Sequence, residues 1–599
     1  MSLPTYTEIG CIPPPTTVPN DVVQHWIASF AGAIARVDVT SVVALFLNDG
    51  WWRDLLSMTW DFRTFHGCNN ITQFLEDRLK ISQLSAIKLA STVSPKLVTP
   101  YPDLGWIQAM FTFETAIGYA NAVIRLVYLP SGEWKAFTLV TSLEMLKGAE
   151  PEIDFDYPTR QDYAAARQEE EQFLNEDPTV LIVGAGQSGL GVAARLKLLG
   201  VKSLIVERNE RVGDQWRKIR YASLRIHDPV WRDQLPLMSM PEPPLWPVFT
   251  PGTKLGDWFE SYVKLLDLNA WTSSMIRDPK YDPAAKEWTV TVVRNDGTSR
   301  TLKTKHIVWA TGLNGGYPNM PDFVGVEDFK GPILHSSQFQ QPASFAGKKV
   351  AVIGSGVSGH DICRDLALTG VDVTMIQRGS TYIMSVKNAI PLQYKELFWK
   401  GSPPTEVADL LYQSFPNPIT ALMSVRVTEK VAELDREMLD GLARVGFRTN
   451  MGIDGSGLFR LALKRGGGSY INVGASEMII DGQIKLKNDS LVDSFTHDGI
   501  QFVDGSVLPA DAVICATGYG NMHGVIEETF GGKVRSVLKP QFWDFDEEGE
   551  IHGIWRDSGH ERFYIAYGNL PNARFYSKFL ALQIKAMEMG VFGSRYSLV

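Results

Sequence analysis

The sequence predicts an α/β protein in which two similar strand-turn-helix units follow a separate α+β domain. The first observation is the stretch at 179–207, TVLIVGAGQSGLGVAARLKLLGVKSLIVE, in which an apolar strand runs directly into a glycine-rich turn and a helix. The second is a repeat of this pattern at 349–361, KVAVIGSGVSGHD. The third is the order of elements before residue 150, where helices precede a long run of strands.

The first glycine turn has the G-x-G-x-x-G spacing, with Gly184, Gly186 and Gly189. The first glycine permits a sharp turn, the second lets the backbone approach a pyrophosphate, and the third lets helix and strand pack closely. The helix N-terminus then offers free N–H groups to phosphate. Glu207 ends the next strand, where an acid accepts hydrogen bonds from a ribose. A Rossmann-like, dinucleotide-binding domain is predicted here.

The second turn repeats the spacing with Gly354, Gly356 and Gly359. Gln377 and Arg378 follow where an NAD site would place an acid. Arg378 can pair bidentately with a 2′-phosphate, which a carboxylate would repel. The second site is therefore predicted to prefer NADPH, and two sites imply two cofactors.

Composition narrows the class of protein. The chain has 599 residues and a net charge of −9, which argues against a nucleic-acid partner. We expect no membrane contact and a cytoplasmic location, because no stretch approaches ~20 apolar residues and no signal peptide is visible. The four cysteines, Cys11, Cys68, Cys363 and Cys515, never form C-x-x-C, so neither a redox-active dithiol nor a metal site is predicted.

Residues 1–150 are predicted to form the α+β domain. The expected helices are 22–36, 39–47 and 70–80, with a turn at 48–50 and strands at 57–65, 106–113, 121–128 and 133–144. This order resembles the cone-shaped nuclear transport factor 2-like and SnoaL-like fold. Asp54, Asp61 and His66 are candidates for a second active site there. A packing domain, or one that joins a homo-oligomer, is the favoured interpretation.

Further candidates lie on loops and at helix starts. Gln215, Trp216 and Arg217 place an amide, an indole and a cation one loop beyond the predicted ribose site, which suits an isoalloxazine edge and a pyrophosphate. Thr311 and Thr517 each stand in an Ala-Thr-Gly turn after a strand. Asn569, Asn572 and Ser577 begin the last helix and are candidates for bonds to a flavin's pyrimidine edge.

The stretch FKGPILHSSQF, with His335 at its centre, has the pattern F-x-G-x-x-x-H-x-x-x-F. Together with both glycine turns and both Ala-Thr-Gly turns, it makes the chain from about 178 to 599 resemble the flavin-containing monooxygenases, class B enzymes that use FAD and NADPH. The layout resembles the long fungal members, with YUCCA-type enzymes as more distant relatives. The resemblance implies that NADPH reduces FAD, and that a C4a-hydroperoxyflavin formed with dioxygen gives one oxygen atom to a nitrogen, sulfur or activated carbon centre of a small-molecule substrate.

The order of elements before residue 150 and this resemblance together predict a division of the chain. The α+β domain (1–150) and a linker (151–178) precede the first part of the FAD domain (179–340). The NADPH domain, with an insertion that contains a helix at 425–442, is predicted at 341–510, so that it interrupts the FAD domain. The second part of the FAD domain then covers 511–599.

Two catalytic residues are proposed, His335 and His227, the second of which stands where many members of the family have an active-site asparagine. His227 either donates a hydrogen bond near the flavin or anchors its own loop. A Baeyer–Villiger monooxygenase is the alternative within the class. In those enzymes the central motif ends in tryptophan followed by proline or aspartate, whereas Phe339 and Gln340 stand here. An uncoupled NADPH oxidase or flavoprotein scaffold is the alternative outside the class.

Overall fold

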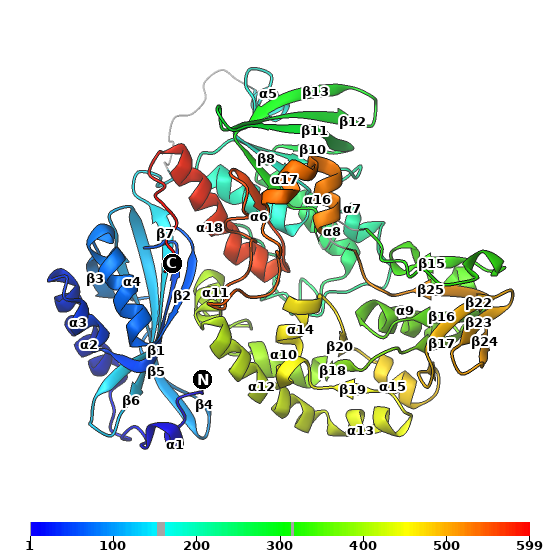
Figure 1. Cartoon of the computed structure of the whole chain (residues 1–599), viewed down its shortest axis with the longest axis horizontal. Coiled ribbons are helices and arrows are strands. Elements are labelled where there is room, and N and C mark those ends of the chain that lie inside the picture. The colour runs from blue at the N-terminus through cyan, green and yellow to red at the C-terminus, as the bar shows by residue number, and fades with distance from the viewer. Residues whose placement is uncertain (1, 152–161, 313–316, 521, 599) are drawn as a thin grey trace.

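The computed structural model describes residues 2–151, 162–312, 317–520 and 522–598. Figure 1 shows an N-terminal domain on the left, a first nucleotide-type domain at the upper centre and a second one at the lower right. The predicted α/β class, with two Rossmann-like domains after an α+β domain, is confirmed. Among the described residues, no helix has the length and apolar character that crossing a membrane requires.

The N-terminal domain is a seven-stranded sheet in the order β2-β1-β7-β6-β5-β3, with β4 paired to β5. Helices α2 and α4 cover one face over an aromatic core in which Trp26, Phe46, Trp52 and Phe74 contact one another. The helices are α1 (Tyr6–Ile9), α2 (Pro19–Ala35), α3 (Val39–Val43) and α4 (Gly67–Ser82). The strands are β1 (Phe46–Leu55), β2 (Phe62–His66), β3 (Ser85–Leu89), β4 (Lys96–Tyr101), β5 (Leu104–Glu114), β6 (Gly118–Tyr128) and β7 (Trp134–Leu146).

The start of this sheet differs from the prediction. The helix expected at 39–47 ends at Val43, and the expected turn at 48–50 lies inside β1, where its pairing with β7 shifts register. The strand expected at 57–65 is a turn followed by β2. Both errors have one cause: Trp51–Leu55 is buried on both faces, so this strand lacks the alternation that marks a half-buried one. Strands β3 and β4 were not predicted.

The first nucleotide domain has the sheet β10-β9-β8-β14-β26, in which the strands are parallel. Its strands are β8 (Val180–Val183), β9 (Ser203–Val206), β10 (Ala270–Trp271), β14 (His306–Trp309) and β26 (Phe563–Ile565), and the antiparallel strands β11 (Ser274–Asp282), β12 (Glu287–Arg294) and β13 (Ser299–Thr304) form a separate sheet. Its helices are α6 (Gln187–Leu198), α7 (Asp214–Arg217), α8 (Gly252–Leu265), α16 (Met522–Phe530), α17 (Gly532–Val537) and α18 (Leu570–Glu588). The predicted linker contains α5 (Tyr163–Gln172), and its residues 152–161 lie outside the described part.

The second nucleotide domain has the parallel sheet β15-β25-β16-β17-β21 and lies between β14 and β26 of the first in the sequence. It contains β15 (Ile333–His335), β16 (Lys349–Ile353), α9 (Val357–Leu368), β17 (Asp372–Ile376), α15 (Ala475–Ile480), β21 (Lys485–Lys487), β22 (Val492–Thr496), β23 (Gly499–Phe502), β24 (Val507–Pro509) and β25 (Ala512–Cys515). Because β15 and β25 pair here, the boundaries expected at 340 and 510 fall inside this domain.

The insertion that follows β17 is mainly helical and lies between the second domain and the N-terminal domain (Figure 1). It contains β18 (Thr381–Ser385), α10 (Val386–Tyr394), α11 (Thr405–Gln413), α12 (Asn417–Leu434), α13 (Arg436–Arg444), β19 (Thr449–Asn450), α14 (Leu458–Arg465) and β20 (Ser469–Asn472). The single helix expected at 425–442 is two helices, because the backbone leaves the helical conformation at Asp435, whose carboxylate accepts bonds from the backbone N–H and hydroxyl of Ser385.

Candidate functional site

The first glycine turn has the geometry that its spacing predicts. Gly184 has a φ of +107°, and a Cβ there would lie 2.5 Å from the carbonyl oxygen of Ala310. A Cβ on Gly189 would lie 2.0 Å from the oxygen of Gly184, so both positions exclude any side chain. A Cβ on Gly186, at the start of α6, would meet nothing within 4 Å. The space in front of the helix N-terminus is therefore open, as a bound pyrophosphate requires.

The second turn repeats this geometry closely. Gly354 has a φ of +118°, and its Cβ would lie 2.4 Å from the oxygen of Ala516, while the corresponding distance from Gly359 to the oxygen of Gly354 is 2.1 Å. A Cβ on Gly356 again meets nothing within 4 Å. Each glycine turn thus packs on the alanine of an Ala-Thr-Gly turn, which gives those two short repeats a structural reason.

The threonines of those turns differ in their hydrogen bonds. The Thr311 hydroxyl is buried and has no hydrogen-bond partner among the described residues. A buried hydroxyl without a partner is unfavourable, so a ligand atom at this place fits the structure. The Thr517 hydroxyl instead donates to the Asn319 carbonyl at 2.6 Å. The open space at Gly186 and the unpaired hydroxyl of Thr311 together fit an FAD bound at the first turn.

Glu207 directly follows β9, beside the first glycine turn, and is 8% exposed. Its carboxylate accepts bonds from the backbone N–H of Ala185 at 2.8 Å and from the backbone and side-chain nitrogens of Asn209 at 2.9 and 2.7 Å. These bonds hold the carboxylate beside the glycine turn, at the strand end where the sequence predicts a ribose contact.

At the second site the two predicted residues have different roles. Gln377 is fully buried and exchanges bonds with the backbone of Arg448, donating at 2.9 Å and accepting at 3.0 Å. Its side chain therefore joins two segments of the fold, and these bonds do not support the predicted contact with the cofactor. Arg378 is exposed, and so is Arg448, whose guanidinium donates to the Arg378 carbonyl at 3.2 Å. Sequence reasoning missed Arg448, because no local pattern connects residues seventy positions apart.

The three candidate residues in the loop after the first glycine turn differ in their contacts. Gln215 and Trp216 are half-buried, and within the described residues the Gln215 side chain makes no hydrogen bond. Arg217, in contrast, pairs with Asp214, Asp257 and Glu260 and donates to two backbone carbonyls. Its guanidinium therefore fastens α7 to α8, and the idea that it binds a pyrophosphate is not supported.

The three candidates at the start of α18, Asn569, Asn572 and Ser577, also differ in their hydrogen bonds. Asn569 caps the helix by accepting a bond from the Asn572 N–H at 3.1 Å. Ser577 is fully buried and donates to the Arg574 carbonyl at 3.2 Å. Asn572 is half-buried, and its amide oxygen lies 3.4 Å from Nε2 of Gln413. Asn569 and Asn572 both keep side-chain amide donors without a partner among the described residues, but only Asn572 is free of the capping role.

The histidine of the central motif is structural. Nδ1 of His335 lies 2.8 Å from the Ser337 hydroxyl, and Nε2 lies 2.8 Å from the Gly518 carbonyl. Burial lowers its pKa, so the ring is neutral and ties β15 to the turn after β25. With both ring nitrogens occupied, the catalytic role predicted for His335 gives way to a structural one. Phe339 is buried as well and packs on Phe345 with ring centres 5.7 Å apart.

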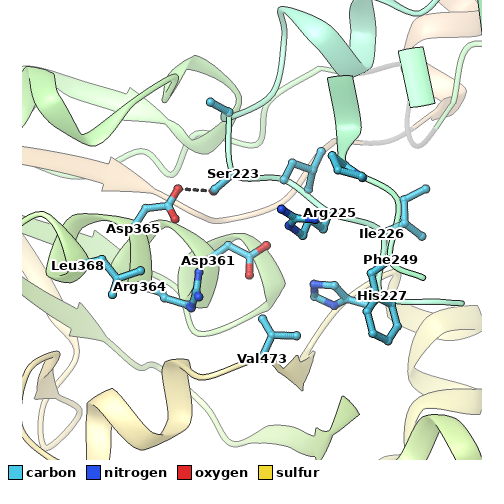
Figure 2. Close-up of a pocket in the computed structure, with 13 residues that line it drawn as sticks. Ser223, Arg225, Ile226, His227, Phe249, Asp361, Arg364, Asp365, Leu368 and Val473 are labelled. Atoms are coloured by element: carbon cyan, nitrogen blue, oxygen red, sulfur yellow. Dashed lines mark hydrogen bonds between the residues drawn. The ribbon is translucent and has the colours of Figure 1, made fainter. Parts of the chain in front are cut away.

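A cavity lies between α9 and the loop that carries His227 (Figure 2). It has a volume of about 530 Å³. Its polar side chains are Ser223, Arg225, His227, Asp361, Arg364 and Asp365, and its apolar ones include Leu224, Ile226, Phe249, Leu368 and Val473. The predicted residue His227 thus faces a cavity that a small molecule can enter, together with residues from the second nucleotide domain.

The two carboxylates of this cavity already have partners. Asp361 accepts a bond from the Tyr221 hydroxyl at 2.6 Å, and Asp365 accepts one from the Ser223 hydroxyl. Burial raises the pKa of both acids, although His227 and Arg364 partly offset this for Asp361. Within the described residues, no hydrogen bond or ion pair forms with the side chains of Arg225, Arg364 or His227. The unused hydrogen-bond donors of the cavity are therefore mainly those of two guanidinium groups.

The three candidates for a second active site have structural roles. Asp54 is fully buried and accepts bonds from the hydroxyls of Ser57, Thr59 and Thr141. Asp61 pairs with Arg556, and the His66 ring stacks on Trp51 with centres 3.9 Å apart. The three side chains point to different neighbours, which agrees with the packing interpretation of this domain.

Comparisons with known proteins identify the family of the chain. Residues 181–403 match the family described as pyridine nucleotide-disulphide oxidoreductase. The chain is 30% identical over 344 residues to the probable indole-3-pyruvate monooxygenase YUCCA3 of Arabidopsis thaliana, which covers 57% of this chain and 72% of the relative. It is also 30% identical over 375 residues to the indole-3-pyruvate monooxygenase YUCCA8 of Oryza sativa subsp. indica, which covers 61% of this chain and 82% of the relative. The chain belongs to the flavin-containing monooxygenase family.

The flavin-containing monooxygenase is therefore an oxidoreductase that uses FAD and NADPH and acts with dioxygen on a small-molecule substrate. Among solved structures, a flavin-containing monooxygenase from Stenotrophomonas maltophilia aligns with a TM-score of 0.46 and 18% identity over 69% of this chain and 99% of that chain. An oxidized steroid monooxygenase bound to NADP aligns with a TM-score of 0.49 and 17% identity over 69% of this chain and 85% of that one.

The buried cysteines of this monooxygenase lack the properties of the redox-active thiols of a dithiol reductase. Cys363 and Cys515 are buried, and burial raises the pKa of both thiols, that of Cys515 to about 11. A thiol needs a lowered pKa to act as a nucleophile, so neither has the character of a redox-active cysteine.

Proposed function

We propose that this monooxygenase oxygenates a small molecule with an apolar body and a carboxylate, at a nitrogen, sulfur or activated carbon atom. The observation that carries the proposal is the cavity between α9 and the 222–227 loop, in which the Arg225 and Arg364 side chains make no hydrogen bond or ion pair with the described residues. Guanidinium groups bind carboxylates with two parallel hydrogen bonds, which makes an acid the ligand that best matches the free donors.

The apolar part of the cavity supports the same substrate class. Leu224, Ile226 and Phe249 line it from the first domain, and Leu368 and Val473 from the second. An apolar group bound there leaves water, while the carboxylate stays close to the two arginines. The relatives carry the name indole-3-pyruvate monooxygenase, and an aromatic 2-oxo acid has both features.

The two cofactors are assigned to the two glycine turns. We propose that Gly184, Gly186 and Gly189 hold FAD, with Glu207, Gln215, Trp216, Thr311 and Asn572 around it, and that Gly354, Gly356, Gly359 and Arg378 hold NADPH. FAD reduced by NADPH supplies the activation of dioxygen. The residues of the chain bind and orient both cofactors.

His227 is proposed to orient the substrate or donate a hydrogen bond beside the flavin. The support is its position in the cavity, near Asp361 and with its ring 6.5 Å from that of Tyr470. An imidazole has one donor and one acceptor when neutral, so it can hold a polar group while the arginines hold the acid. A cytoplasmic location and a homo-oligomer through the N-terminal domain stay predictions.

The test is NADPH consumption with indole-3-pyruvate, with its methyl ester and without substrate, measured together with hydrogen peroxide. The acid is expected to raise consumption and lower the peroxide yield, and the ester to do so weakly. For the acid, Arg364→Met should raise KM about tenfold or more, since it removes a charge-assisted bond of about 1.5 to 3 kcal/mol. Equal use of acid and ester would contradict the carboxylate, and full conversion of NADPH into peroxide under all conditions would favour an uncoupled oxidase.

A further inference from the structure

The N-terminal sheet has a second face, opposite α2 and α4, that packs on the rest of the chain (Figure 1). Phe62 contacts Tyr576 and Phe579 of α18, and Lys578 of α18 pairs with Glu144 of β7 at 2.7 Å. Apolar residues of this sheet share one continuous core with the first nucleotide domain. Both faces of the sheet are therefore covered by the same chain.

Arg53 of β1 is fully buried in this interface. Its guanidinium pairs with both carboxylate oxygens of Glu550, at 2.6 and 2.7 Å. The remaining nitrogen, Nη1, donates to the carbonyl of Gln413 at 2.6 Å. Gln413 is the last residue of α11, so Arg53 binds one of the carbonyls that a helix leaves unpaired at its C-terminus.

Arg125 of β6 binds the same helix end. It is 1% exposed and donates to the Leu411 carbonyl at 3.2 Å and to the Ser414 hydroxyl at 2.8 Å. Its guanidinium lies 3.4 Å from the centre of the Phe415 ring. Burial lowers the pKa of Arg125 to about 9, which leaves it charged at neutral pH, and it forms no ion pair within the described residues. A cation at a helix C-terminus is favourable, because the carbonyl dipoles point towards it.

The other side of α11 contacts the start of α18. Asp409 pairs with Arg574 through two bonds of 2.6 Å each, and Nε2 of Gln413 lies 3.4 Å from the amide oxygen of Asn572. Arg574 also donates to the carbonyls of Arg232 and Gln234, at 2.7 and 2.6 Å. One helix thus contacts both the N-terminal domain and the residue proposed to lie at the flavin edge.

We propose that Arg53 and Arg125 are positioning residues for the flavin: by fixing the C-terminal end of α11, they hold Asn572 and Arg574 where FAD binds. The proposal rests on the FAD site assigned above. The N-terminal domain is then a part of the flavin site, although none of its residues is proposed to contact the cofactor.

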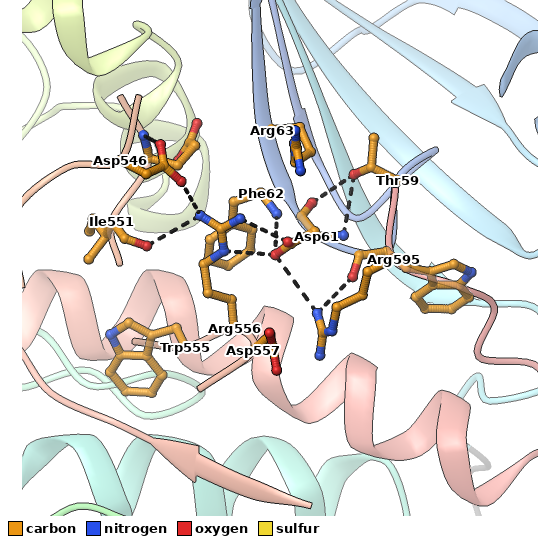
Figure 3. A network of polar contacts seen from close by, with 12 residues as sticks. Thr59, Asp61, Phe62, Arg63, Asp546, Ile551, Trp555, Arg556, Asp557 and Arg595 are labelled. Carbon is orange, nitrogen blue, oxygen red and sulfur yellow. Dashed lines mark hydrogen bonds and ion pairs between the residues drawn. The ribbon is translucent and has the colours of Figure 1, made fainter. Parts of the chain in front are cut away.

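A second set of contacts in the same interface serves as a control. Figure 3 shows Arg556 between Asp61 and Asp546, with Arg595 on the other side of Asp61. Nearby, Arg63 of β2 pairs with Glu548 and donates to the Tyr596 carbonyl at 2.8 Å. Arg63 joins the N-terminal domain to these segments without contacting α11. Removing its side chain loosens the interface and leaves the helix end bound.

The experiment compares Arg125→Met, Arg125→Lys, Gln413→Ala and the control Arg63→Met in the full chain. Flavin fluorescence quenching gives the Kd for FAD, visible circular dichroism reports the surroundings of the bound flavin, and thermal unfolding gives stability. Arg125→Met and Gln413→Ala are expected to raise the Kd about fivefold or more and to change the dichroism. Arg125→Lys should lie between them and the wild type, because it keeps the charge and loses the planar fork.

Arg63→Met is expected to lower Tm while Kd and dichroism stay unchanged. The proposal is overturned if Arg125→Met and Gln413→Ala bind FAD as the wild type does, or if Arg63→Met has the same effect on the flavin. Should Arg125→Met fail to fold, Arg125→Lys and Gln413→Ala decide together, because the first weakens the hold on the helix end and the second removes only the side-chain link to Asn572. Gly186→Val separates the two proposals: FAD binding that survives this change refutes the assigned site itself.

Discussion

Arg378 is expected to decide the choice between NADPH and NADH. Its side chain is exposed at the end of β17, in the position where an acid would select NADH, and Arg448 lies beside it. Gln377 keeps the two arginines together, because its buried amide bonds to the Arg448 backbone. We expect Arg378→Ala to weaken NADPH and to leave NADH nearly unchanged, since NADH has no 2′-phosphate.

The size of the effect follows from exposure. A hydrogen bond to a charged group contributes about 1.5 to 3 kcal/mol, but solvent reduces the contribution of exposed pairs to about 1 kcal/mol or less. For an exposed guanidinium on a phosphate we therefore expect about 1 kcal/mol, which is roughly a fivefold rise in KM for NADPH. Arg448→Ala should have a similar effect, and the double variant should lose more than either single one.

The assay is the steady-state KM for each coenzyme, with flavin reduction followed in the absence of oxygen as a second measurement. Arg277→Ala is the matched control, since it removes an exposed arginine from β11, far from β17 in the fold. Equal losses for NADPH and NADH in Arg378→Ala would refute the reasoning, and so would a comparable loss in Arg277→Ala.

Three further predictions concern the cofactors, pH and stability. Gly186→Val should abolish FAD binding, whereas Gly356→Val should leave a yellow protein that NADPH reduces slowly. Flavin absorbance measures the first effect and stopped-flow reduction the second. A colourless Gly356→Val protein would contradict the assignment of NADPH to the second glycine turn. Burial raises the pKa of Asp361 above its unfolded value, so ionisation of this carboxyl lowers the stability of the folded protein as pH rises. Asp361→Asn should therefore raise Tm more at pH 8 than at pH 4. An equal shift of Tm at both pH values would contradict this prediction. Arg53→Met should lower the free energy of unfolding by about 3 to 5 kcal/mol, since it leaves Glu550 buried without its partner, and Arg53→Met with Glu550→Gln should recover part of this in denaturant unfolding.

The nucleotide turns were predictable because their requirements are local. Gly184 and Gly189 exclude a side chain for reasons set within one strand-turn-helix unit, and the G-x-G-x-x-G spacing records them directly. The same holds for the parallel strands on either side, which are short apolar runs. Glu207 and Arg378 also follow at fixed offsets from the glycines, so the sequence places both at the correct strand ends.

The roles of single side chains were less accessible. A sequence shows that Gln377 and His335 stand in motif positions, but not that each has its polar atoms bonded to distant backbone, at Arg448 and Gly518. Arg217 is a comparable case, since its three acidic partners include two on α8. Polar residues near a motif satisfy either a ligand or the fold, and only the three-dimensional contacts distinguish the two.

The N-terminal domain is the clearest case of a feature that the sequence does not predict. Its boundary near residue 150 is visible in the order of elements, and this suggests a separable unit. The structure shows instead that Arg53 and Glu550 bury their charges against each other across that boundary. Two charges that lose water are costly to separate inside the fold, so the interface depends on both partners being present. Because Arg53 also holds the end of α11, the same buried contact that joins the domains reaches the start of α18 through Gln413 and Asn572. Separation of the domain is therefore expected to disturb flavin binding as well as folding.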